Sequence, residues 1–516
     1  MLAFAVLLLA LARRFKLPYP VLLALAGAAV AVAQVDVGLD LNPELALALF
    51  IAPVLLDAAY DTSLRDLKRH WAPVASLVVI AVGLTTFAVA LVVHALIPRI
   101  PWAAAIAIGA IVAPPDAVAA TTVLRDLRLP HRVSVILEGE ALLNDASSLL
   151  IYRLAVAAVL AGGSIGADDR TRLLLSLFGS VITGFALAWL IGRLTSRIQD
   201  APSSIIVQFV STYGVWILAE RAGLSPILTM VSYAMTLARS TPAVLPARHR
   251  IPSYAVWDTT VLVLNVLAFL LIGFELGPII SAARPGELAR WAGVGAAVLA
   301  TVIGVRLLWT VAAALWAQWR IQRGWLTAPG DGPLPSWRTG LIIGWAGTRG
   351  LVTVATALAL PQDFPERSML LFVAFTVTLG TLLIQGLTLR PLALALCLRD
   401  DEDTVAREVR AARLAAAEAA LASLSDAPRE EAESVRAELQ AERQMAARLD
   451  EGNGPPIFPA QALRARALAA RRNRLLAMRR DGVIGDEAFH RIEEELDLAE
   501  LALTGRRGSL PKAEER

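Results

Sequence analysis

The first 397 residues of the chain contain thirteen apolar stretches, and most of them could cross a lipid bilayer as a helix. A helix needs about 20 apolar residues to span the hydrocarbon core. The expected spans are approximately 1–12 (short), 17–33, 44–59, 71–97, 102–124, 133–162, 171–192, 203–220, 224–239, 256–281, 291–318, 338–360 and 368–397. Only 18% of the 516 residues are charged, whereas a soluble domain has about 25%. We therefore predict an all-α polytopic membrane protein with about thirteen transmembrane helices.

Composition also excludes several other classes of protein. The single cysteine, Cys397, excludes a disulfide-stapled secreted module. The net charge of +3 comes from 48 basic and 45 acidic residues, and this balance gives no indication of a nucleic-acid partner. The five histidines have no metal-ligand spacing, so a zinc enzyme is not predicted, and no cofactor is implied.

Basic residues in the short loops predict the orientation of the chain, because cytoplasmic loops are enriched in Lys and Arg. Alternate loops hold 17 basic residues, and the intervening loops hold 7. The richer set is Arg13, Arg14, Lys16, Arg65, Lys68, Arg69, Arg125, Arg128, Arg132, Arg193, Arg197, Arg239, Arg248, Arg250, Arg320, Arg323 and Arg338. We expect a multi-pass protein of the inner (plasma) membrane with its N-terminus outside and its C-terminal tail in the cytoplasm.

The chain changes character at Arg399, where a polar tail begins. We predict a transmembrane domain over 1–398 and a helical cytoplasmic regulatory tail over 399–516. The segment between Pro455 and Arg480 holds seven arginines and no acidic residue. This pattern fits either attachment to anionic lipid headgroups or a regulatory partner, or simply a solvated helix face.

Two of the expected spans contain features that interrupt a helix. Pro114 and Pro115 remove two backbone donors in the middle of span 102–124, and Asp116 follows them. Span 338–360 has a matching weakness, because Gly347 and Gly350 flank Arg349, whose charge would offset the carbonyl ends of the broken pair. The two spans run in opposite directions. This arrangement predicts inverted repeats with two discontinuous helices that cross at an ion site.

Span 133–162 carries the densest group of ionisable residues within an apolar stretch, and such residues usually mark an ion or substrate path. At about 100° per residue, Asp145 lies on the same face as Glu138, while Glu140 and Asn144 share another face with Ser148 between them. The available counter-charges are Arg306 and Arg349. We expect Glu140 to form a structural ion pair. Asp145 and Asp116 are then left to bind a cation or a proton.

The residues quoted above resemble those of bacterial sodium/proton antiporters of the monovalent cation:proton antiporter-1 family, which is related to animal sodium/proton exchangers. Three motifs carry the resemblance. They are Gly-Glu-Ala-Leu-Leu-Asn-Asp at 139–145, Gly-Trp-Ala-Gly-Thr-Arg-Gly at 344–350 and Gly-Thr-Leu-Leu-Ile-Gln-Gly-Leu-Thr-Leu-Arg-Pro at 380–391. The resemblance covers the second to thirteenth spans, about three quarters of the chain. The tail also resembles the cytoplasmic extension of bacterial members of the family.

The resemblance implies a fold and a set of functional residues. It implies thirteen helices, a six-helix ion-translocating bundle beside a dimerisation bundle, and homodimers that work by an elevator-like movement. It also implies roles for individual residues: Asp145 as the essential ion-binding carboxylate with Asn144 as its neighbour, Asp116 at the unwound crossing, Glu140 paired with Arg306, and Asp57 and Arg349 lining the site. The Asn-Asp pair implies electroneutral exchange of Na⁺ for H⁺.

This chain departs from the family pattern at two positions. Pro115-Asp116-Ala117 replaces the usual Thr-Asp-Pro, and Ala141 replaces a frequent serine. Two oxygen ligands are therefore missing, and the choice among Na⁺, Li⁺ and K⁺ stays open. Thr121, Ser147 and Ser148 are candidate substitutes for these hydroxyls, and Asp57, Glu138 and Ser148 are further candidates for the cation and proton site.

Three other functions were weighed against sodium/proton exchange. A potassium/proton antiporter is the main alternative within the class. An intramembrane aspartyl protease would also place two aspartates on neighbouring helices, but its Gly-x-Gly-Asp run is absent. A cation channel would share the composition and would differ in showing flux that neither saturates nor depends on protons.

Overall fold

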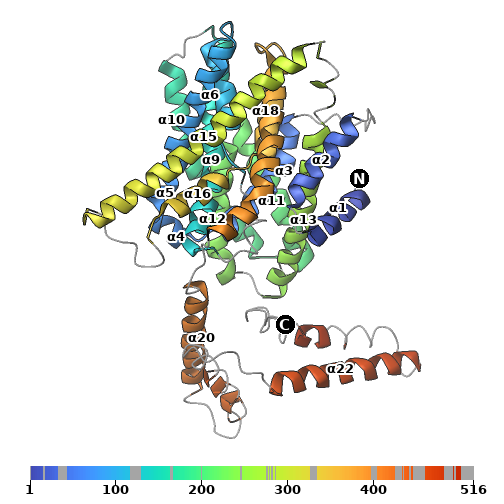
Figure 1. Cartoon of the computed structure of the whole chain (residues 1–516). Coiled ribbons are helices and arrows are strands. Elements are labelled where there is room, and N and C mark those ends of the chain that lie inside the picture. The colour runs from blue at the N-terminus through green and yellow to red at the C-terminus, as the bar shows by residue number, and fades with distance from the viewer. Residues whose placement is uncertain are drawn as a thin grey trace. The chain divides into compact units, whose positions relative to one another are not determined.

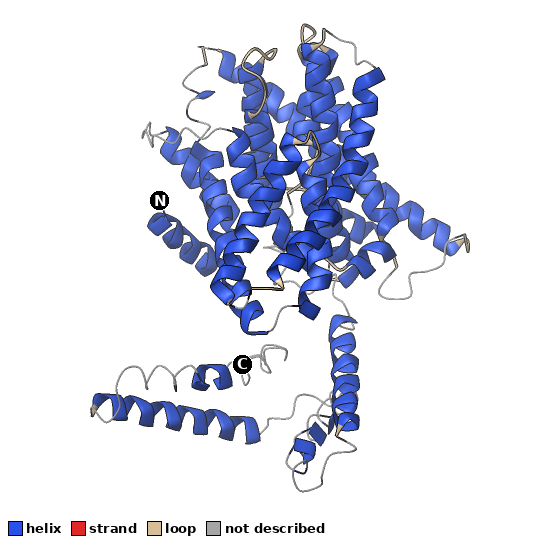
Figure 2. Ribbon diagram, turned by 180° about the vertical axis from the view of Figure 1, so that it is seen from behind, coloured by secondary structure: helices blue, strands red, loops and turns tan. Residues whose placement is uncertain are grey.

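The structure is a computed structural model, and it describes the chain in segments. The described residues are 2–15, 18–32, 43–116, 129–162, 167–198, 200–244, 247–274, 277, 279–280, 283–284, 286–325, 334–396, 404–424, 433, 435–437, 439–440, 443–444, 459–481, 492 and 495–500. Over these residues every regular element is a helix (Figure 2). The chain divides into two compact units, Met1–Asp401 and Glu402–Arg516.

The first unit is a bundle of helices (Figure 1). Its helices are α1 (Leu2–Phe15), α2 (Tyr19–Val32), α3 (Pro43–Asp61), α4 (Leu64–Arg69), α5 (Trp71–Ala75), η1 (Ser76–Ala81), α6 (Val82–Leu96), α7 (Trp102–Val112), α9 (His131–Leu160), α10 (Ala167–Thr195), α11 (Ala201–Arg221), α12 (Pro226–Val244), α13 (Ala247–Phe274), α15 (Glu287–Gln322), α16 (Trp337–Trp345), α17 (Leu351–Leu358), α18 (Arg367–Thr381), η2 (Leu382–Gly386) and α19 (Leu387–Ala395).

Helix length and composition confirm a multi-pass membrane protein. Among the described residues, seven helices are long and apolar enough to cross a membrane. These seven are 71–96, 131–160, 175–195, 201–221, 249–274, 287–322 and 367–395. Shorter apolar helices lie at Tyr19–Ala31, Ala48–Tyr60 and Trp102–Val112. The total of thirteen spans remains a prediction, because the other expected spans form helices that are short or broken.

Small residues allow the helices of this unit to pack closely, as is common in membranes. Helix α2 packs on α13, and α10 packs on α12. A Cβ added to Gly273 of α13 would lie 2.3 Å from the backbone nitrogen of Ala28 in α2. A Cβ on Gly184 of α10 would lie 2.5 Å from the carbonyl oxygen of Thr229 in α12. Both contacts are between backbones, so neither position can accept a side chain without a shift of the helix.

A π-helical turn, η1, joins α5 to α6, and its contacts tie three helices together. Such turns widen a helix locally and leave backbone groups for other partners. The Ser147 hydroxyl of α9 donates to the carbonyl of Val78 at 2.8 Å, and Trp309 Nε1 of α15 donates to Ser76 Oγ at 3.1 Å. The η1 turn therefore connects α9 and α15, the two helices whose charged residues meet in the site below.

The second unit contains α20 (Thr404–Ser423), α22 (Pro459–Arg480) and a short helical segment at 495–500. Leu475 of α22 and Leu496 are buried against each other. Arg472, one of the seven arginines of the basic segment, forms ion pairs with Asp497 at 2.5 Å and Glu500 at 2.8 Å. An acidic segment of the tail thus neutralises part of the basic helix.

Candidate functional site

The two interrupted spans meet where each loses its helical structure. Helix α7 ends at Val112 and is followed by a non-helical segment that reaches Asp116, and residues 346–350 separate α16 from α17. The backbone N–H of Asp116 donates to the carbonyl of Thr348 at 2.6 Å, and Thr348 Oγ1 donates to the carbonyl of Asp116 at 3.1 Å. The two predicted interruptions are confirmed, and they contact each other. The part of the first span beyond Asp116 lies outside the described residues.

Arg349 is fully buried at this crossing and caps the broken end of α7. Its Nε donates to the carbonyl of Val112 at 2.9 Å, and its Nη2 donates to the carbonyl of Ala113 at 3.0 Å. Its Nη1 donates to the carbonyl of Gly347. The last carbonyls of a helix have no intrahelical partner and carry partial negative charge. Arg349 therefore supplies the hydrogen bonds and the positive charge that the interruption of α7 leaves unmet.

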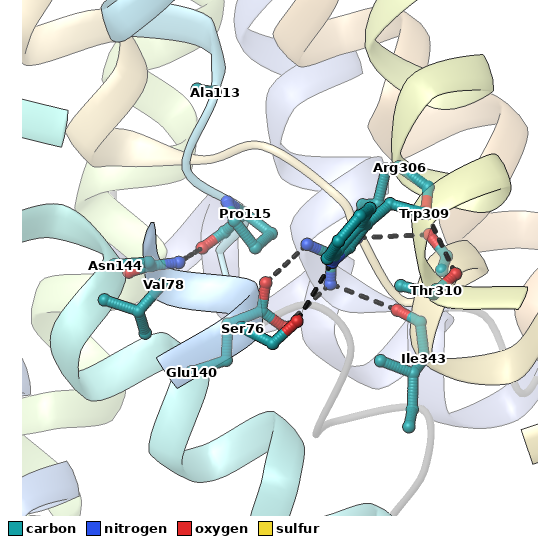
Figure 3. A network of polar contacts seen from close by, with 12 residues as sticks. Ser76, Val78, Ala113, Pro115, Glu140, Asn144, Arg306, Trp309, Thr310 and Ile343 are labelled. Carbon is teal, nitrogen blue, oxygen red and sulfur yellow. Dashed lines mark hydrogen bonds and ion pairs between the residues drawn. The ribbon is translucent and has the colours of Figure 1, made fainter. Parts of the chain in front are cut away.

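Glu140 and Arg306 form a two-point ion pair inside the protein (Figure 3). Arg306 Nη1 lies 2.5 Å from Glu140 Oε1, and Arg306 Nη2 lies 2.8 Å from Glu140 Oε2. Arg306 also donates to the carbonyls of Ile343 at 3.1 Å and Gly344 at 3.2 Å, which are the last turn of α16. Each broken helix therefore has an arginine on its carbonyl end, Arg349 for α7 and Arg306 for α16.

Asp145 lines a cavity of about 100 Å³ beside the crossing. The cavity is also lined by Asp116, Ala141, Asn265, Gly350 and Thr353. Asp145 is buried, and in the described part of the chain no side chain forms a hydrogen bond or an ion pair with its carboxylate. A buried carboxylate without a partner is costly as a bare anion. This position therefore needs a proton or a cation to neutralise it.

Asn144 connects α9 to the break in the preceding span. Its side-chain Nδ2 donates to the carbonyl of Pro115 at 2.8 Å (Figure 3). Within the described residues its buried Oδ1 has no hydrogen-bond donor. Since Asp145 follows Asn144 directly, this contact fixes the distance between the Asp145 backbone and the segment that carries Asp116.

The other sequence-predicted residues occupy different places. Asp57, on α3, lines a separate cavity of about 590 Å³ rather than the one that contains Asp145. Glu138 is exposed and does not line the Asp145 cavity. The hydroxyl of Ser148 donates to the carbonyl of Asp145 at 3.3 Å, so it contacts the backbone and not the carboxylate. Ser147 bonds to the η1 turn, and Thr121 lies outside the described residues.

Two polar residues of the cavity are not predicted from the sequence. Asn265 of α13 and Thr353 of α17 both line it with Asp145. A signal for Asn265 was present, because it is the single amide within the apolar run from Val261 to Leu271. Thr353 gave no such signal, because threonine is common in transmembrane helices and forms hydrogen bonds with their backbone.

Interrupted helices that meet beside buried carboxylates and arginines are typical of secondary transporters. The sequence matches the transmembrane sodium/hydrogen exchanger family over residues 1–395. The chain belongs to this family, whose members are transporters and not enzymes.

Individual relatives agree with this assignment. The chain is 30% identical over 364 residues to the sodium, potassium, lithium and rubidium/H⁺ antiporter of Bacillus pumilus, covering 68% of this chain and 54% of that protein. It is 30% identical over 411 residues to the uncharacterized Na⁺/H⁺ exchanger YjcE of Escherichia coli, covering 75% of this chain and 73% of that protein. The chain thus spans about half the length of the Bacillus relative.

A solved structure shows the same fold. The sodium proton antiporter MjNhaP1 of Methanocaldococcus jannaschii superimposes with a TM-score of 0.59 at 18% identity. The match covers 77% of this chain and 96% of that structure. The helical arrangement described above is therefore that of an antiporter fold.

Proposed function

We propose that this protein exchanges a monovalent cation, Na⁺ in the first instance, for H⁺ across the membrane. The observation that carries the proposal is the buried carboxylate of Asp145, which lines a small cavity at the crossing of two broken helices and has no partner among the described side chains. The family to which the chain belongs supports the same function.

The chemistry of the site explains how one residue couples the two ions. The Asp145 carboxylate is neutralised either by a covalently bound proton or by a coordinated cation, so the two ligands exclude each other. Asp116, Asn265 and Thr353 line the same cavity and offer further oxygen atoms to a dehydrated cation. A site that crosses the membrane only when it is neutral then exchanges one ion for the other and needs no separate coupling device.

We also propose that the site accepts more than one monovalent cation. The threonine and serine hydroxyls that the family usually provides are replaced by Pro115 and Ala141, and the Bacillus pumilus relative is named for sodium, potassium, lithium and rubidium. These two observations favour a broad cation range. Potassium/proton exchange is therefore the second candidate.

We further propose how the transporter is placed and assembled. The basic loops support an N-terminus outside and a cytoplasmic C-terminal tail, and the fold supports a homodimer in which the ion-binding bundle moves by an elevator-like step. Glu140, Arg306 and Arg349 hold the crossing together, and Asp145, Asp116 and Asn144 form the transport site. Asp57, Glu138 and Ser148 do not line the Asp145 cavity, and we propose them only as supporting residues elsewhere along the ion path.

The test is proton flux in everted vesicles on the addition of Na⁺, Li⁺ or K⁺ in turn. We expect saturable proton release with at least one cation, and no flux with Asp145→Asn. The matched control is Asp363→Asn, which removes an exposed carboxylate between α17 and α18 that lines neither the Asp145 cavity nor the Asp57 cavity and should retain exchange. Full exchange in a folded Asp145→Asn protein would refute the role of Asp145, and residual coupled exchange would move the site to Asp116.

A further inference from the structure

Helix α15 is longer than a membrane requires. Its 36 residues, Glu287–Gln322, correspond to about 54 Å at 1.5 Å per residue, whereas the hydrocarbon core is about 30 Å thick. Even at a tilt of 40° the helix would rise about 41 Å. Since Arg306 lies near its middle in the ion pair with Glu140, the last two turns of α15 reach the surface of the membrane.

These last turns carry an ordered group of aromatic and basic side chains, which we call the Trp–Arg cluster. It consists of Trp316, Trp319, Arg320, Arg323 and Trp325. The guanidinium carbon of Arg320 lies 4.9 Å from the ring centre of Trp316, and that of Arg323 lies 4.8 Å from the ring centre of Trp319. Residues four apart share one face of a helix, so both stacked pairs point the same way.

The end of α15 holds the third tryptophan in place. Gly324 adopts a left-handed conformation with φ 72°, which ends the helix. The N–H of Trp325 then donates to the carbonyl of Arg320 at 3.0 Å, and the N–H of Gly324 donates to the carbonyl of Ile321 at 3.0 Å, as in a Schellman cap. This cap turns the Trp325 ring edge-on to Trp319, with ring centres 5.2 Å apart.

The cluster presents positive charge and aromatic surface together, and no carboxylate in the described part of the chain neutralises it. The sequence has no acidic residue from Leu288 to Gly330. Among the described residues, the guanidiniums of Arg320 and Arg323 form no ion pair. The residues Trp316 and Trp325 are 60% and 63% exposed. Tryptophan is favoured at the level of lipid headgroups, and arginine forms two-point hydrogen bonds with phosphate.

We propose that the Trp–Arg cluster is a binding site for the headgroup of an anionic phospholipid. The two arginines contact the lipid phosphate, and stacking on Trp316 and Trp319 orients each guanidinium. The tryptophan rings lie among the glycerol and upper acyl groups. Because α15 also carries Arg306, a bound lipid would fix the membrane depth of a helix that contributes to the transport site.

A similar pair occurs on another helix. Arg193 of α10 lies 6.0 Å from the ring centre of Trp189, again four residues earlier and near the C-terminal end of its helix. The loop charges place this end on the same side of the membrane as the end of α15. With one arginine in place of two, the α10 pair offers a weaker lipid site. It accounts for the residual lipid binding expected when the Trp–Arg cluster is removed.

The test is native mass spectrometry of the purified full chain with added phosphatidylglycerol, phosphatidylcholine or glycerol phosphate. We expect wild type to bind phosphatidylglycerol most tightly, and Arg320→Gln/Arg323→Gln to bind it about 30-fold more weakly. Arg320→Lys/Arg323→Lys, which keeps the charge but loses the planar stacking, should lie between them. Glycerol phosphate, which lacks acyl chains, should bind far more weakly than the lipid.

The matched control is Arg99→Gln/Arg290→Gln, which removes two exposed arginines from the opposite membrane surface. It should bind phosphatidylglycerol as wild type does. The proposal fails if Arg320→Gln/Arg323→Gln binds as wild type does, if the control weakens binding equally, or if phosphatidylcholine or glycerol phosphate binds as tightly as phosphatidylglycerol. None of these outcomes depends on whether the protein exchanges sodium for protons.

Discussion

The carboxylate of Asp116 lies directly against the backbone of Gly350, the residue that precedes α17. A Cβ placed on Gly350 would fall 1.5 Å from Asp116 Oδ2. No side chain fits between the two residues, so the absence of a side chain at position 350 is what allows the two broken helices to cross with Asp116 inside the cavity.

Gly350→Ala should therefore displace Asp116 and impair exchange. A displacement of about 1 Å at a reacting group can cost about 100-fold in rate, and we expect a loss of this size in cation-dependent proton flux. The control is Gly304→Ala on α15, where an added Cβ meets nothing within 4 Å. Wild-type flux in Gly350→Ala would show that Asp116 is not held by this contact.

The Glu140–Arg306 pair should be structural. Both side chains are buried, with 1% and 3% of their surface exposed, and removal of one partner leaves the other charge stranded. We expect Glu140→Ala to lower the free energy of unfolding by about 3–5 kcal/mol, measured as a lower folded yield and a lower thermal midpoint.

Two further variants separate the lost charge pair from the substitution itself. Glu140→Gln combined with Arg306→Gln removes both charges and should recover part of the stability. Glu138→Ala changes an exposed acidic residue of the same helix and should have little effect. A Glu140→Ala protein as stable as wild type would contradict the structural role.

Sequence chemistry predicts the two helix interruptions because their cause is local. Two prolines remove backbone donors at 114–115, and glycines flank Arg349 at the second break. The capping role of Arg349 was predicted for the same reason, since an unmet helix end attracts a cation. The contact between Asp116 and Thr348 follows once both breaks lie at the same depth.

Other parts of the site depend on contacts that no local pattern shows. Helix α3 is apolar on all sides, so the sequence does not reveal that Asp57 faces the larger cavity. Ser147 was a candidate ligand, but its hydroxyl bonds to a carbonyl of a π-helical turn. That turn has no sequence signature. Asn265 and Thr353 join the cavity from helices far apart in the chain.

The C-terminal tail should modulate transport without performing it. Every intramembrane polar residue of the site precedes residue 399, and the tail forms a compact unit of its own from Glu402. A chain cut after Arg399 should still exchange ions in everted vesicles, with a shifted pH profile. Complete loss of exchange in a truncated protein that is folded by size-exclusion chromatography would refute this prediction.

The short helix α4, whose C-cap residue is His70, should lose stability below about pH 6.5. Burial lowers the pKa of His70 below its ordinary value of 6.5, and the neighbouring Arg132 and Arg69 add to this effect, although a hydrogen bond to Asp66 opposes it. Nδ1 of His70 lies 3.0 Å from the carbonyl oxygen of Asp66. Because the folded pKa is depressed, the opened segment binds a proton first, and the stability present above pH 6.5 is lost as the pH falls.

Asp66 itself should not contribute over this range. Burial raises the pKa of Asp66, but hydrogen bonds with Ser63, Arg65 and His131 lower it by more. The pKa of Asp66 therefore lies below its ordinary value of 3.8. Hydrogen exchange of residues 64–70, corrected for intrinsic rates, should be faster at pH 5.5 than at pH 7.5. His70→Gln should remove the difference, and an unchanged pH dependence in that variant would assign it to another group.

The last prediction concerns the stoichiometry set by Asp145. Its neighbour Asn144 carries no charge and is bonded to Pro115, so one carboxylate alternates between a proton and a cation. One monovalent cation should then move per proton, and no net charge should cross the membrane. In proteoliposomes, an imposed membrane potential should therefore leave wild-type flux unchanged, whereas a proton gradient should drive it. Flux that follows the potential would show that a second carboxylate, with Asp116 nearest in the cavity, also carries charge across. In that case Asp116→Asn should make the remaining exchange insensitive to voltage, which distinguishes a second carrier from an ion leak.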